Sequence, residues 1–310
     1  MTTSATQPGW IDDAAAREPS LPMHRVGAGA SWAEALDPVA TARSLWRARG
    51  LLSQFARRDV EARNRGSVLG ILWTLLNPLV MLAVYTFVFA VVWEARWEGT
   101  GAAAGAGEKT LFAITLFAGI IAYEVFAATV NSAPLVIVHN PNFVKRVVFP
   151  LEVLPLSTLL ASLAVFACGM AVLIAANLAL RGGVSGTIWL TPIVLLPLVL
   201  TAGGIALLVS ALGVFLRDIK PVVGVLTQVL FFTTPILYPA SKLAKAPDWM
   251  RAVLSANPLT PIFEGVRDVM VFGRYPDFAG LAVSTLVGVA IFQAGRAVFT
   301  KLKRGFADVI

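Results

Sequence analysis

VLPLSTLLASLAVFACGMAVLIAANLAL, residues 153–180, is a run of 28 residues without one charged side chain. A helix that crosses the hydrocarbon core of a bilayer needs about 20 apolar residues. Because lipid offers no hydrogen-bond partners, a spanning segment satisfies its backbone only as a helix or within a closed barrel. Barrel strands alternate polar and apolar residues, and this run does not. The stretch therefore predicts a transmembrane helix.

Five further apolar stretches lie on either side of it. They are residues 66–93, 110–138, 182–216, 221–241 and 278–295, and together they contain one charge, Glu124. Only 14% of the 310 residues are charged, whereas soluble proteins carry about a quarter. One soluble core could not bury so many apolar stretches. The sequence thus predicts an all-α integral membrane protein with six transmembrane helices, and it excludes a soluble enzyme, a disulfide scaffold and a disordered chain.

The basic residues lie unevenly around these stretches. Six crossings put both termini on one side, and the segments next to the membrane there hold fifteen Lys and Arg, against three in the two short loops opposite. Because cytoplasmic loops are enriched in Lys and Arg, we expect both termini in the cytoplasm. The net charge of +7 follows the membrane flanks, which favours a bilayer rather than a nucleic acid as its partner.

Two segments precede the first apolar stretch. Residues 1–42 lack an apolar signal-peptide core and are rich in Ala, Pro, Asp and Ser, so we expect a flexible cytoplasmic tail. Residues 43–65 interleave apolar residues with arginines, which predicts an amphipathic helix in the membrane interface, broken or bent at Gly50. This helix is either a topogenic anchor or a guide for a charged lipid head group. The phosphate donors of the second interpretation are Arg57, Arg58, Arg63 and Arg65.

The connection between the second and third stretches begins HNPNFVKRVVFP at residue 139. Asn140-Pro141 can start a short helix, and the apolar residues that follow surround Lys145-Arg146. An exposed cytoplasmic apolar patch indicates a protein contact, and a membrane-surface loop is the alternative.

The last outer segment, residues 242–277, has apolar residues at helical spacing in two pieces, divided by Asn257-Pro258 and Pro261. Each piece is too short to cross the bilayer. We therefore expect re-entrant or interfacial half-helices, with an ordinary interfacial loop as the alternative. Glu264 and Arg267 stand three residues apart on the second piece, where they can pair.

Two acids lie in or beside apolar stretches, where ionisable residues are functional candidates. Glu124, near the centre of the second stretch, either lines a polar path or holds a neighbouring helix by a hydrogen bond. Glu152 lies at the start of the third, and we expect it to pair with Lys145, Arg146 or an interface arginine.

The sequence lacks the patterns of covalent catalysis. Its two histidines, His24 and His139, are far apart and lack metal-ligand spacing. Glu108 separates Gly107 from Lys109, which breaks the Walker pattern, and no serine lies in a nucleophile elbow. We expect no enzymatic activity, no catalytic or metal-binding residue and no cofactor in this chain.

Five segments resemble, in the same order, parts of the ABC-2-type permeases that export polysaccharides. They are RRDVEARNRGSVLGILWTLLNPLVMLAVYTFVF (57–89), NPNFVKRVVFPLEVLPLS (140–157), FLRDIKPVV (215–223), FFTTPILYP (231–239) and NPLTPIFEGVRDVMVFG (257–273). Residues 66–310 then correspond to the six-helix transmembrane domain of that family, and 43–65 to its interfacial gate helix.

The resemblance implies the transmembrane subunit of an ATP-driven exporter in the bacterial plasma (inner) membrane. Such a subunit forms a homodimer with two copies of a separate ATP-binding subunit, which binds the ATP and Mg²⁺. Its substrate is a lipid-linked polysaccharide, such as O-antigen or teichoic acid. The half-helices with Glu264 and Arg267 would form an outer gate. The residues that would couple to the ATPase are Asn140, Phe143, Lys145, Arg146, Val147 and Phe149.

Two apolar stretches carry aromatic and polar side chains on one helical face. Aromatic rings offer sugars flat faces without fixed charge, and a polymer path needs many weak contacts. We hypothesise that these faces line the conduit, and packing against lipid or other helices is the alternative. The residues are Trp73, Asn77, Met81, Tyr85 and Phe89 in the first stretch, and Gln228, Phe231, Phe232 and Tyr238 in the fifth.

Two rival functions stay open. An ABC-2 permease for a drug or a lipid shares the same fold. A membrane glycosyltransferase would need an acidic motif in a loop, whereas Asp218 and Asp268 each stand beside an arginine and are typical of salt-bridge partners.

Overall fold

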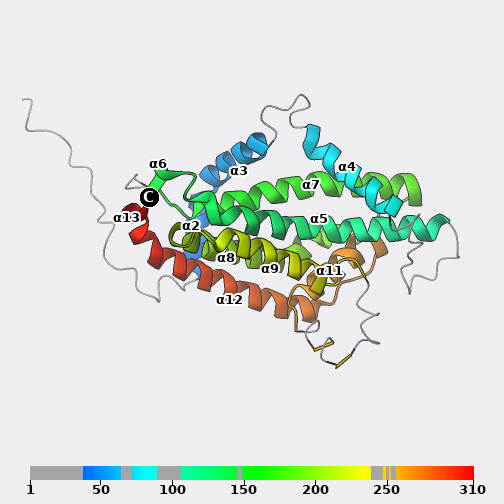
Figure 1. Cartoon of the computed structure of the whole chain (residues 1–310). Coiled ribbons are helices and arrows are strands. Elements are labelled where there is room, and N and C mark those ends of the chain that lie inside the picture. Colours follow the sequence, from blue (N-terminus) through cyan, green and yellow to red (C-terminus); the bar gives the residue numbers. More distant parts are fainter. Residues whose placement is uncertain are drawn as a thin grey trace, which may run out of the picture.

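The computed structural model describes residues 38–63, 72–88, 106–144, 149–238, 247–248, 251–252 and 256–310. These residues form helices and turns, and no strand occurs among them. Four helices are long and apolar enough to cross a membrane. They are α5 (Ala106–Val136), α7 (Val153–Arg181), α8 (Thr191–Phe215) and α12 (Phe278–Leu302), and they run along one bundle (Figure 1). The prediction of an all-helical membrane protein is confirmed for the part of the chain described.

Two further apolar helices are shorter. α4 (Trp73–Tyr85) has 13 residues and α9 (Ile219–Thr233) has 15. At 1.5 Å per residue each is about 20 Å long, less than the roughly 30 Å hydrocarbon core. α4 packs against α5 and α7, whereas α9 packs against α5 and α8. The first and fifth crossings therefore stay predictions, and residues 66–71 and 89–93 of the first lie outside the described residues.

The central helices approach one another through glycine. A Cβ atom on Gly204 of α8 would meet the backbone of Phe292 in α12, and one on Gly295 of α12 would overlap the Gly204 carbonyl group. Gly213 of α8 lies in the same way against the Pro134 carbonyl group of α5. Lipid provides no hydrophobic drive between helices, so small residues that admit close backbone contact stabilise the packing.

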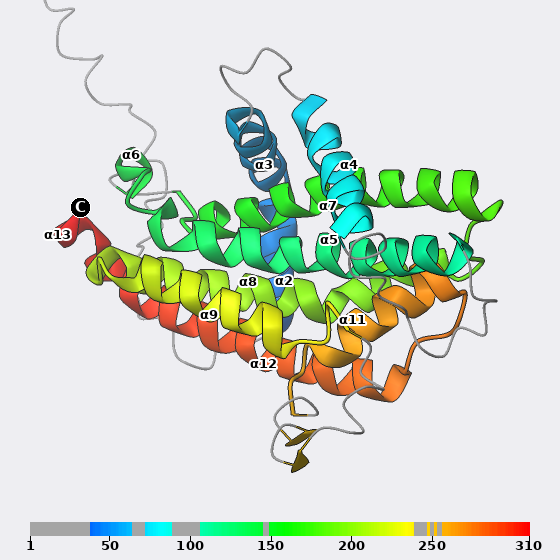
Figure 2. The same ribbon diagram turned by 45° about the vertical axis from the view of Figure 1, so that its right-hand side comes forward.

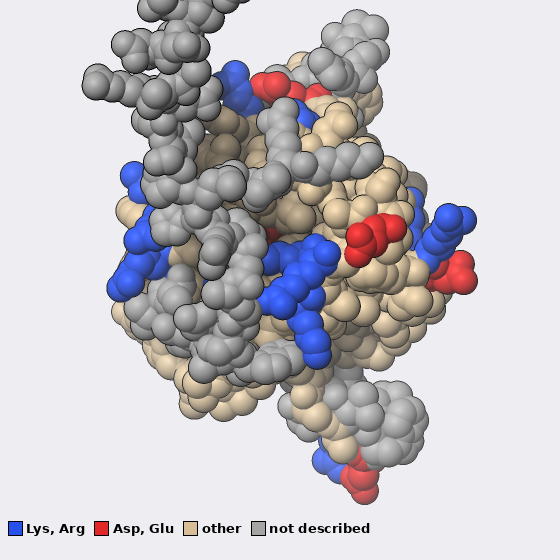
Figure 3. All heavy atoms as spheres, turned by 90° about the vertical axis from the view of Figure 1, so that its left-hand side faces the viewer, with Lys and Arg blue, Asp and Glu red and all other residues tan. Residues whose placement is uncertain are grey.

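One end of the bundle, called the basic end below, gathers the connections predicted on the cytoplasmic side. α6 (Pro141–Val144) and the C-terminal α13 (Phe306–Val309) lie there in both ribbon views (Figures 1 and 2). Phe215 is the last residue of α8, and its ring centroid lies 5.9 Å from that of Phe306 in α13. Lys and Arg side chains show on this face (Figure 3). The structure thus groups the connections as the Lys and Arg distribution predicts.

The predicted interface helix forms two helices, α2 (Pro38–Arg47) and α3 (Arg49–Arg63). α2 begins inside the predicted tail, and residues 1–37 lie outside the described part of the chain. The interruption is a turn at Ala48, and Gly50 lies within α3. Hydrogen bonds across the turn, such as Leu52 N–H to the Ala48 carbonyl at 2.9 Å, keep the backbone nearly helical. The helix is thus interrupted, as predicted, but at Ala48 and not at Gly50.

The outer segment contains a short helix, α11 (Thr260–Arg267), followed by a π-helical turn, η5 (Asp268–Phe272). Asn257 Oδ1 accepts a hydrogen bond from the Leu259 amide at 3.0 Å and so stabilises the start of this helix. Pro261 lies in the first turn, where a proline loses no hydrogen bond. The second predicted piece therefore begins after Asn257-Pro258, with Pro261 inside its first turn, and much of the first piece lies outside the described residues. α11 is buried against α5, α8 and α12, and a re-entrant path stays a prediction.

Gly295→Val tests the glycine contact between α8 and α12. We expect it to lower the free energy of unfolding by at least about 1 kcal/mol, because the added side chain forces two backbones apart. The measurement is an unfolding titration with sodium dodecyl sulfate in mixed micelles. Gly224→Val is the control, since a Cβ there meets nothing within 4 Å. Equal midpoints for the two variants would contradict the packing argument.

Candidate functional site

A cavity of about 260 Å³ lies between α4, α5 and α7. Its wall is mixed: Asn77 and Tyr85 come from α4, Glu124 from α5 and Ser162 from α7, among apolar side chains. Residues at i and i+4 share a helix face, which brings Asn77, Met81 and Tyr85 of α4 to one side. We call this the acidic cavity, because Glu124 is the charged group on its wall.

Local sequence shapes the acidic cavity. Pro78, within α4, is buried on its wall, and a proline inside a helix cannot donate the backbone hydrogen bond to the residue four positions earlier. Across from it, Gly169 of α7 admits the Ile121 side chain of α5, whose Cγ2 atom would lie 3.0 Å from a Cβ at that position. The glycine brings α5 and α7 together at the cavity and places Glu124 on its wall.

The structure brings some of the predicted conduit residues together. Asn77, Met81 and Tyr85 line the acidic cavity with Glu124, whose two predicted roles included lining a polar path. Trp73 is exposed on the same helix, and Phe89 lies outside the described residues. No spacing in the sequence links Glu124 of α5 to the α4 face. The role of these residues as a conduit stays a prediction.

The predicted conduit residues of the fifth stretch lie on the other side of α5. The Phe231 ring lies 5.2 Å from that of Tyr123 and 5.3 Å from that of Phe232. The Tyr238 hydroxyl donates to the Phe232 carbonyl at 3.1 Å, and Gln228 is exposed. Both ribbon views place α5 between α4 and α9 (Figures 1 and 2). Within one chain, the two predicted conduit faces therefore do not face each other.

Polar side chains that the sequence analysis missed hold α9 to α5. The Tyr123 hydroxyl donates to the Thr227 carbonyl oxygen, and Thr227 Oγ1 donates to Asn131 Oδ1 at 3.1 Å. Hydrogen bonds of this kind join helices in an apolar medium. The sequence contains one sign of this contact: Asn131 is a polar residue in a long apolar stretch, where it needs a hydrogen-bond partner.

At the basic end, three aromatic rings join α3 to the connection at 140–149. The ring centroid of Phe55 lies 5.2 Å from that of Phe143 and 5.6 Å from that of Phe149. The centroids of Phe143 and Phe149 are 4.7 Å apart. Arg58 Nη2 donates to Asn140 Oδ1 at 3.1 Å. We call this cluster the aromatic junction. It joins predicted gate-helix and coupling residues that are 82 positions apart in the chain.

The structure describes only some of the other residues predicted to act at the basic end. Arg57 is exposed and pairs with Glu61 at 2.8 Å, and that hydrogen bond raises the pKa of Arg57. Arg65, Lys145, Arg146 and Val147 lie outside the described residues, as does the side chain of Arg63. Glu152 accepts a hydrogen bond from Lys303 at 2.8 Å. The predicted partners of Glu152 were Lys145, Arg146 or an interface arginine. The observed partner, Lys303, lies instead near the C-terminus.

The predicted outer-gate residues both lie on α11. Arg267 is only 2% exposed, and its Nη2 donates to the Ile236 carbonyl oxygen. The guanidinium packs against Gly119 of α5, where a Cβ would lie 3.2 Å from Nη2. Glu264 is half-buried one turn earlier. A buried charge must be hydrogen-bonded to be tolerated, so Arg267 holds the outer segment against the bundle. Its pairing with Glu264 stays a prediction.

Met81→Cys in a Cys168→Ser background tests whether water fills the acidic cavity. We expect a water-soluble thiol reagent to modify it about tenfold faster than Leu79→Cys, because apolar surroundings raise a thiol pKa and suppress the reactive thiolate. Leu79 is exposed on another face of α4 and does not line the cavity. The measurement is the rate of mass increase, and equal rates would contradict an aqueous cavity.

Comparison with known proteins identifies the family. A family model described as "ABC-2 type transporter" matches residues 51–271. The O-antigen export system permease protein RfbA of Klebsiella pneumoniae is 28% identical over 262 residues, 84% of this chain and 95% of that protein. The protein of the same name from Myxococcus xanthus is 27% identical over 268 residues, 86% of this chain and 98% of its own. The family model covers this helical, multi-pass chain from α3 to η5, and the chain therefore belongs to the ABC-2 type transporter family.

Proposed function

We propose that this chain is the membrane-spanning subunit of an ATP-driven exporter that moves a lipid-linked polysaccharide out of the bacterial cytoplasm. The observation that carries the proposal is the similarity, over most of both chains, to proteins named O-antigen export system permeases. In this proposal the chain forms the passage in the inner membrane, with both termini in the cytoplasm. A separate ATP-binding subunit binds ATP with Mg²⁺ and supplies the energy.

The position of the two aromatic faces supports a homodimer. The α4 face with Asn77 and Tyr85 and the α9 face with Gln228 and Phe232 lie on different sides of α5 in one chain. Two copies can place the α4 face of one opposite the α9 face of the other. Because α9 also exposes Val225, Leu226 and Val229, it has apolar area available for such a contact. A conduit between two copies would then be lined by both faces.

The aromatic junction supports coupling to the ATP-binding subunit. It lies at the basic end, where an ATPase in the cytoplasm would dock. Packed interfaces shift between discrete arrangements instead of deforming continuously. A push on the 140–149 connection would therefore move α3 with it, through the rings of Phe55, Phe143 and Phe149 and the Arg58–Asn140 hydrogen bond. In this proposal two ATP-binding subunits, one for each copy, drive α3 as a gate.

The acidic cavity suits a sugar better than an apolar drug. Its wall offers Asn77, Tyr85, Glu124 and Ser162, which can hydrogen-bond hydroxyl groups, next to apolar surface that matches a ring face. An ABC-2 permease for a drug or a lipid is the nearest alternative. The names of the relatives favour a polysaccharide substrate over a drug or a lipid. They also favour transport over glycosyl transfer.

The function is tested by deleting this chain in its native cell and restoring it. We expect deletion to remove a glycan from the cell surface and to leave its lipid-linked form inside, because synthesis continues without export. The readouts are surface glycan by antibody or lectin and lipid-linked glycan by extraction. Unchanged surface glycan together with increased drug sensitivity would favour the drug-export alternative. ATP hydrolysis by the purified chain alone would contradict a separate ATP-binding subunit.

Phe55→Ala tests the aromatic junction. We expect export to fall about tenfold while ATP hydrolysis persists, since two ring contacts worth roughly 0.5–1.5 kcal/mol each are lost. The measurement is glycan export and ATPase rate in the assembled transporter. Phe278→Ala is the matched control, because that ring is 53% exposed at the start of α12, away from the junction. Parallel loss of ATPase activity and export, with less assembled complex, would contradict a coupling role.

A further inference from the structure

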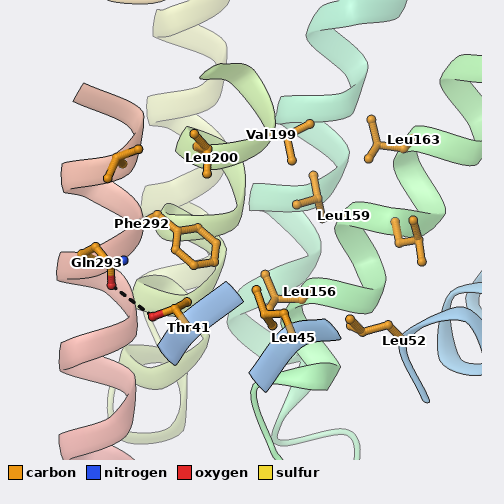
Figure 4. A pocket seen from close by; sticks show the side chains of 12 residues that line it. Thr41, Leu45, Leu52, Leu156, Leu159, Leu163, Val199, Leu200, Phe292 and Gln293 are labelled. Atoms are coloured by element: carbon orange, nitrogen blue, oxygen red, sulfur yellow. Dashed lines mark hydrogen bonds between the residues drawn. The ribbon is translucent and has the colours of Figure 1, made fainter. Parts of the chain in front are cut away.

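α2 has two different faces, and one of them packs on the bundle. Thr41 Oγ1 donates to Gln293 of α12 at 3.5 Å, and the side chain of Leu45 lines an apolar groove of about 360 Å³. This apolar groove lies between α2, α3 and the wall formed by α7, α8 and α12, where Leu52 of α3 and Leu159 of α7 also line it (Figure 4). The side chains of this inner face therefore fix which way α2 is turned.

The opposite face of α2 exposes an aromatic ring among arginines. Arg43, Trp46 and Arg47 stand three and four residues apart, so they share a helix face, and all three are exposed. Trp46 is 68% exposed, whereas tryptophan is highly buried on average. The guanidinium carbon of Arg49 lies 4.6 Å from the centroid of the Trp46 ring, in a cation–π contact, and Arg49 Nη1 donates to the Trp46 carbonyl at 3.3 Å. We call Arg43, Trp46, Arg47 and Arg49 the arginine face.

The arginine face differs from the arginines of α3 that the sequence analysis linked to a lipid head group. Arg57 of α3 pairs with Glu61, and Arg58 donates to Asn140. Residues 38–58, by contrast, contain no Asp or Glu. Within the part of the chain that the structure describes, no carboxylate forms an ion pair with an arginine of this face. None of the described carboxylates therefore balances its charge, and an anionic partner would.

α2 lies at the level where a bilayer has its head groups. A small cavity has Ser44 and Ala48 on one side and, on the other, Pro150 and Val153 at the start of α7. α7 has 29 residues, which makes it about 43 Å long at 1.5 Å per residue. A bilayer with its head groups is about 40–45 Å thick, so the start of α7 lies among them. In both ribbon views α2 and α3 run across the bundle and not along it, as helices in the plane of a membrane surface do (Figures 1 and 2).

The residues of the arginine face suit phospholipid head groups at this level. The guanidinium group of arginine presents a fork of N–H donors that matches a phosphate. Tryptophan is enriched at membrane–water interfaces, where its ring lies at the level of the head groups. Clusters of basic residues on an amphipathic helix attract anionic lipids. Because the arginine face points away from the bundle wall, the surrounding head groups are what it meets.

We propose that the arginine face binds the phosphate groups of anionic phospholipids in the leaflet at the basic end. Arg43 and Arg47 hold the phosphate, and Trp46 lies among the head groups with Arg49 stacked on its ring. Bilayer phospholipid is the committed source, because it surrounds α2 on this side in large excess over any lipid carrier, and occupancy follows concentration. This contact is independent of the transported substrate.

The first test measures which lipid collects beside α2 in the full chain. Gln54 is exposed and stands seven residues after Arg47, on the same helix face, so Gln54→Cys in a Cys168→Ser background carries a bimane label. The vesicles contain phosphatidylcholine and phosphatidylglycerol, and one of the two carries a quenching nitroxide on an acyl chain near the head group. At equal amounts, we expect nitroxide-phosphatidylglycerol to quench about fivefold more than nitroxide-phosphatidylcholine, the factor that one basic residue near an anionic lipid provides.

Variants separate the charge of the arginine face from other causes. Arg43→Gln with Arg47→Gln should remove the preference for phosphatidylglycerol, and Arg43→Lys with Arg47→Lys should keep it. Arg217→Gln with Lys220→Gln removes the same charge from exposed residues next to and within α9, so this matched control should leave the preference unchanged. A preference that survives Arg43→Gln with Arg47→Gln overturns the proposal.

A label at the other end of the bundle controls for general attraction. Val184 is 37% exposed in the connection after α7, and bimane on Val184→Cys should show no preference between the two lipids. An equal preference at both positions would mean that the basic chain as a whole gathers anionic lipid. That result would overturn a site on α2.

A second measurement identifies the occupant directly. p-Benzoylphenylalanine in place of Trp46 is irradiated in native membranes, and we expect the mass of a phospholipid on the peptide that contains it. Attachment to a polyprenyl lipid would assign the arginine face to a lipid carrier. Attachment to another protein, to a second copy or to residues 1–37 of the same chain would make it a protein contact, and each of these results would overturn the proposal. Neither measurement depends on transport, so both stand whether or not the proposed function holds.

Discussion

Close contact between helix backbones is the constraint on which the rest of this structure depends. Hydrocarbon satisfies no backbone hydrogen bond and adds no hydrophobic drive between helices. The chain meets this constraint by placing glycine where α8 touches its neighbours: Gly204 against α12 and Gly213 against α5. With α8 held on two sides, α5 and α7 take up the positions that form the acidic cavity, and α7 and α12 form the wall of the apolar groove.

Side chains that donate hydrogen bonds to distant carbonyl groups complete the structure at the end opposite the basic end. Thr187 Oγ1 donates to the Val269 carbonyl at 3.0 Å, and Ser284 Oγ donates to that of Pro258 at 2.7 Å. Arg181 Nη1 donates to the Val271 carbonyl at 2.6 Å, and Arg267 donates to that of Ile236. These bonds satisfy carbonyl groups in irregular backbone, which a helix would otherwise satisfy internally. They hold α11 and η5 against the bundle.

α7 connects the three features described above. Leu156 and Leu159 face the groove, and Ser162 and Phe166 face the acidic cavity. At the start of the same helix, Ser157 Oγ hydrogen-bonds Asp59 of α3 at 3.4 Å. A displacement of α3 through the aromatic junction therefore reaches the helix that lines both the cavity and the groove. In the proposed function, this contact gives an event at the basic end a route to the interior of the bundle.

The sequence alone determined the helical class, the extents of α5, α7 and α12 within a few residues at most ends, and the gathering of basic connections at one end. These features follow from local causes, namely charge-free runs of spanning length and the Lys and Arg beside them. A spacing of four residues also predicted the face shared by Asn77, Met81 and Tyr85. Only the tertiary structure decided that Glu124 joins this face, that Phe55 meets Phe143 and Phe149, and that Glu152 pairs with Lys303. Such pairings depend on which distant helix faces pack together. That packing depends on close backbone contact at positions such as Gly204 and Gly213, and no local sequence pattern predicts which residues these glycines contact.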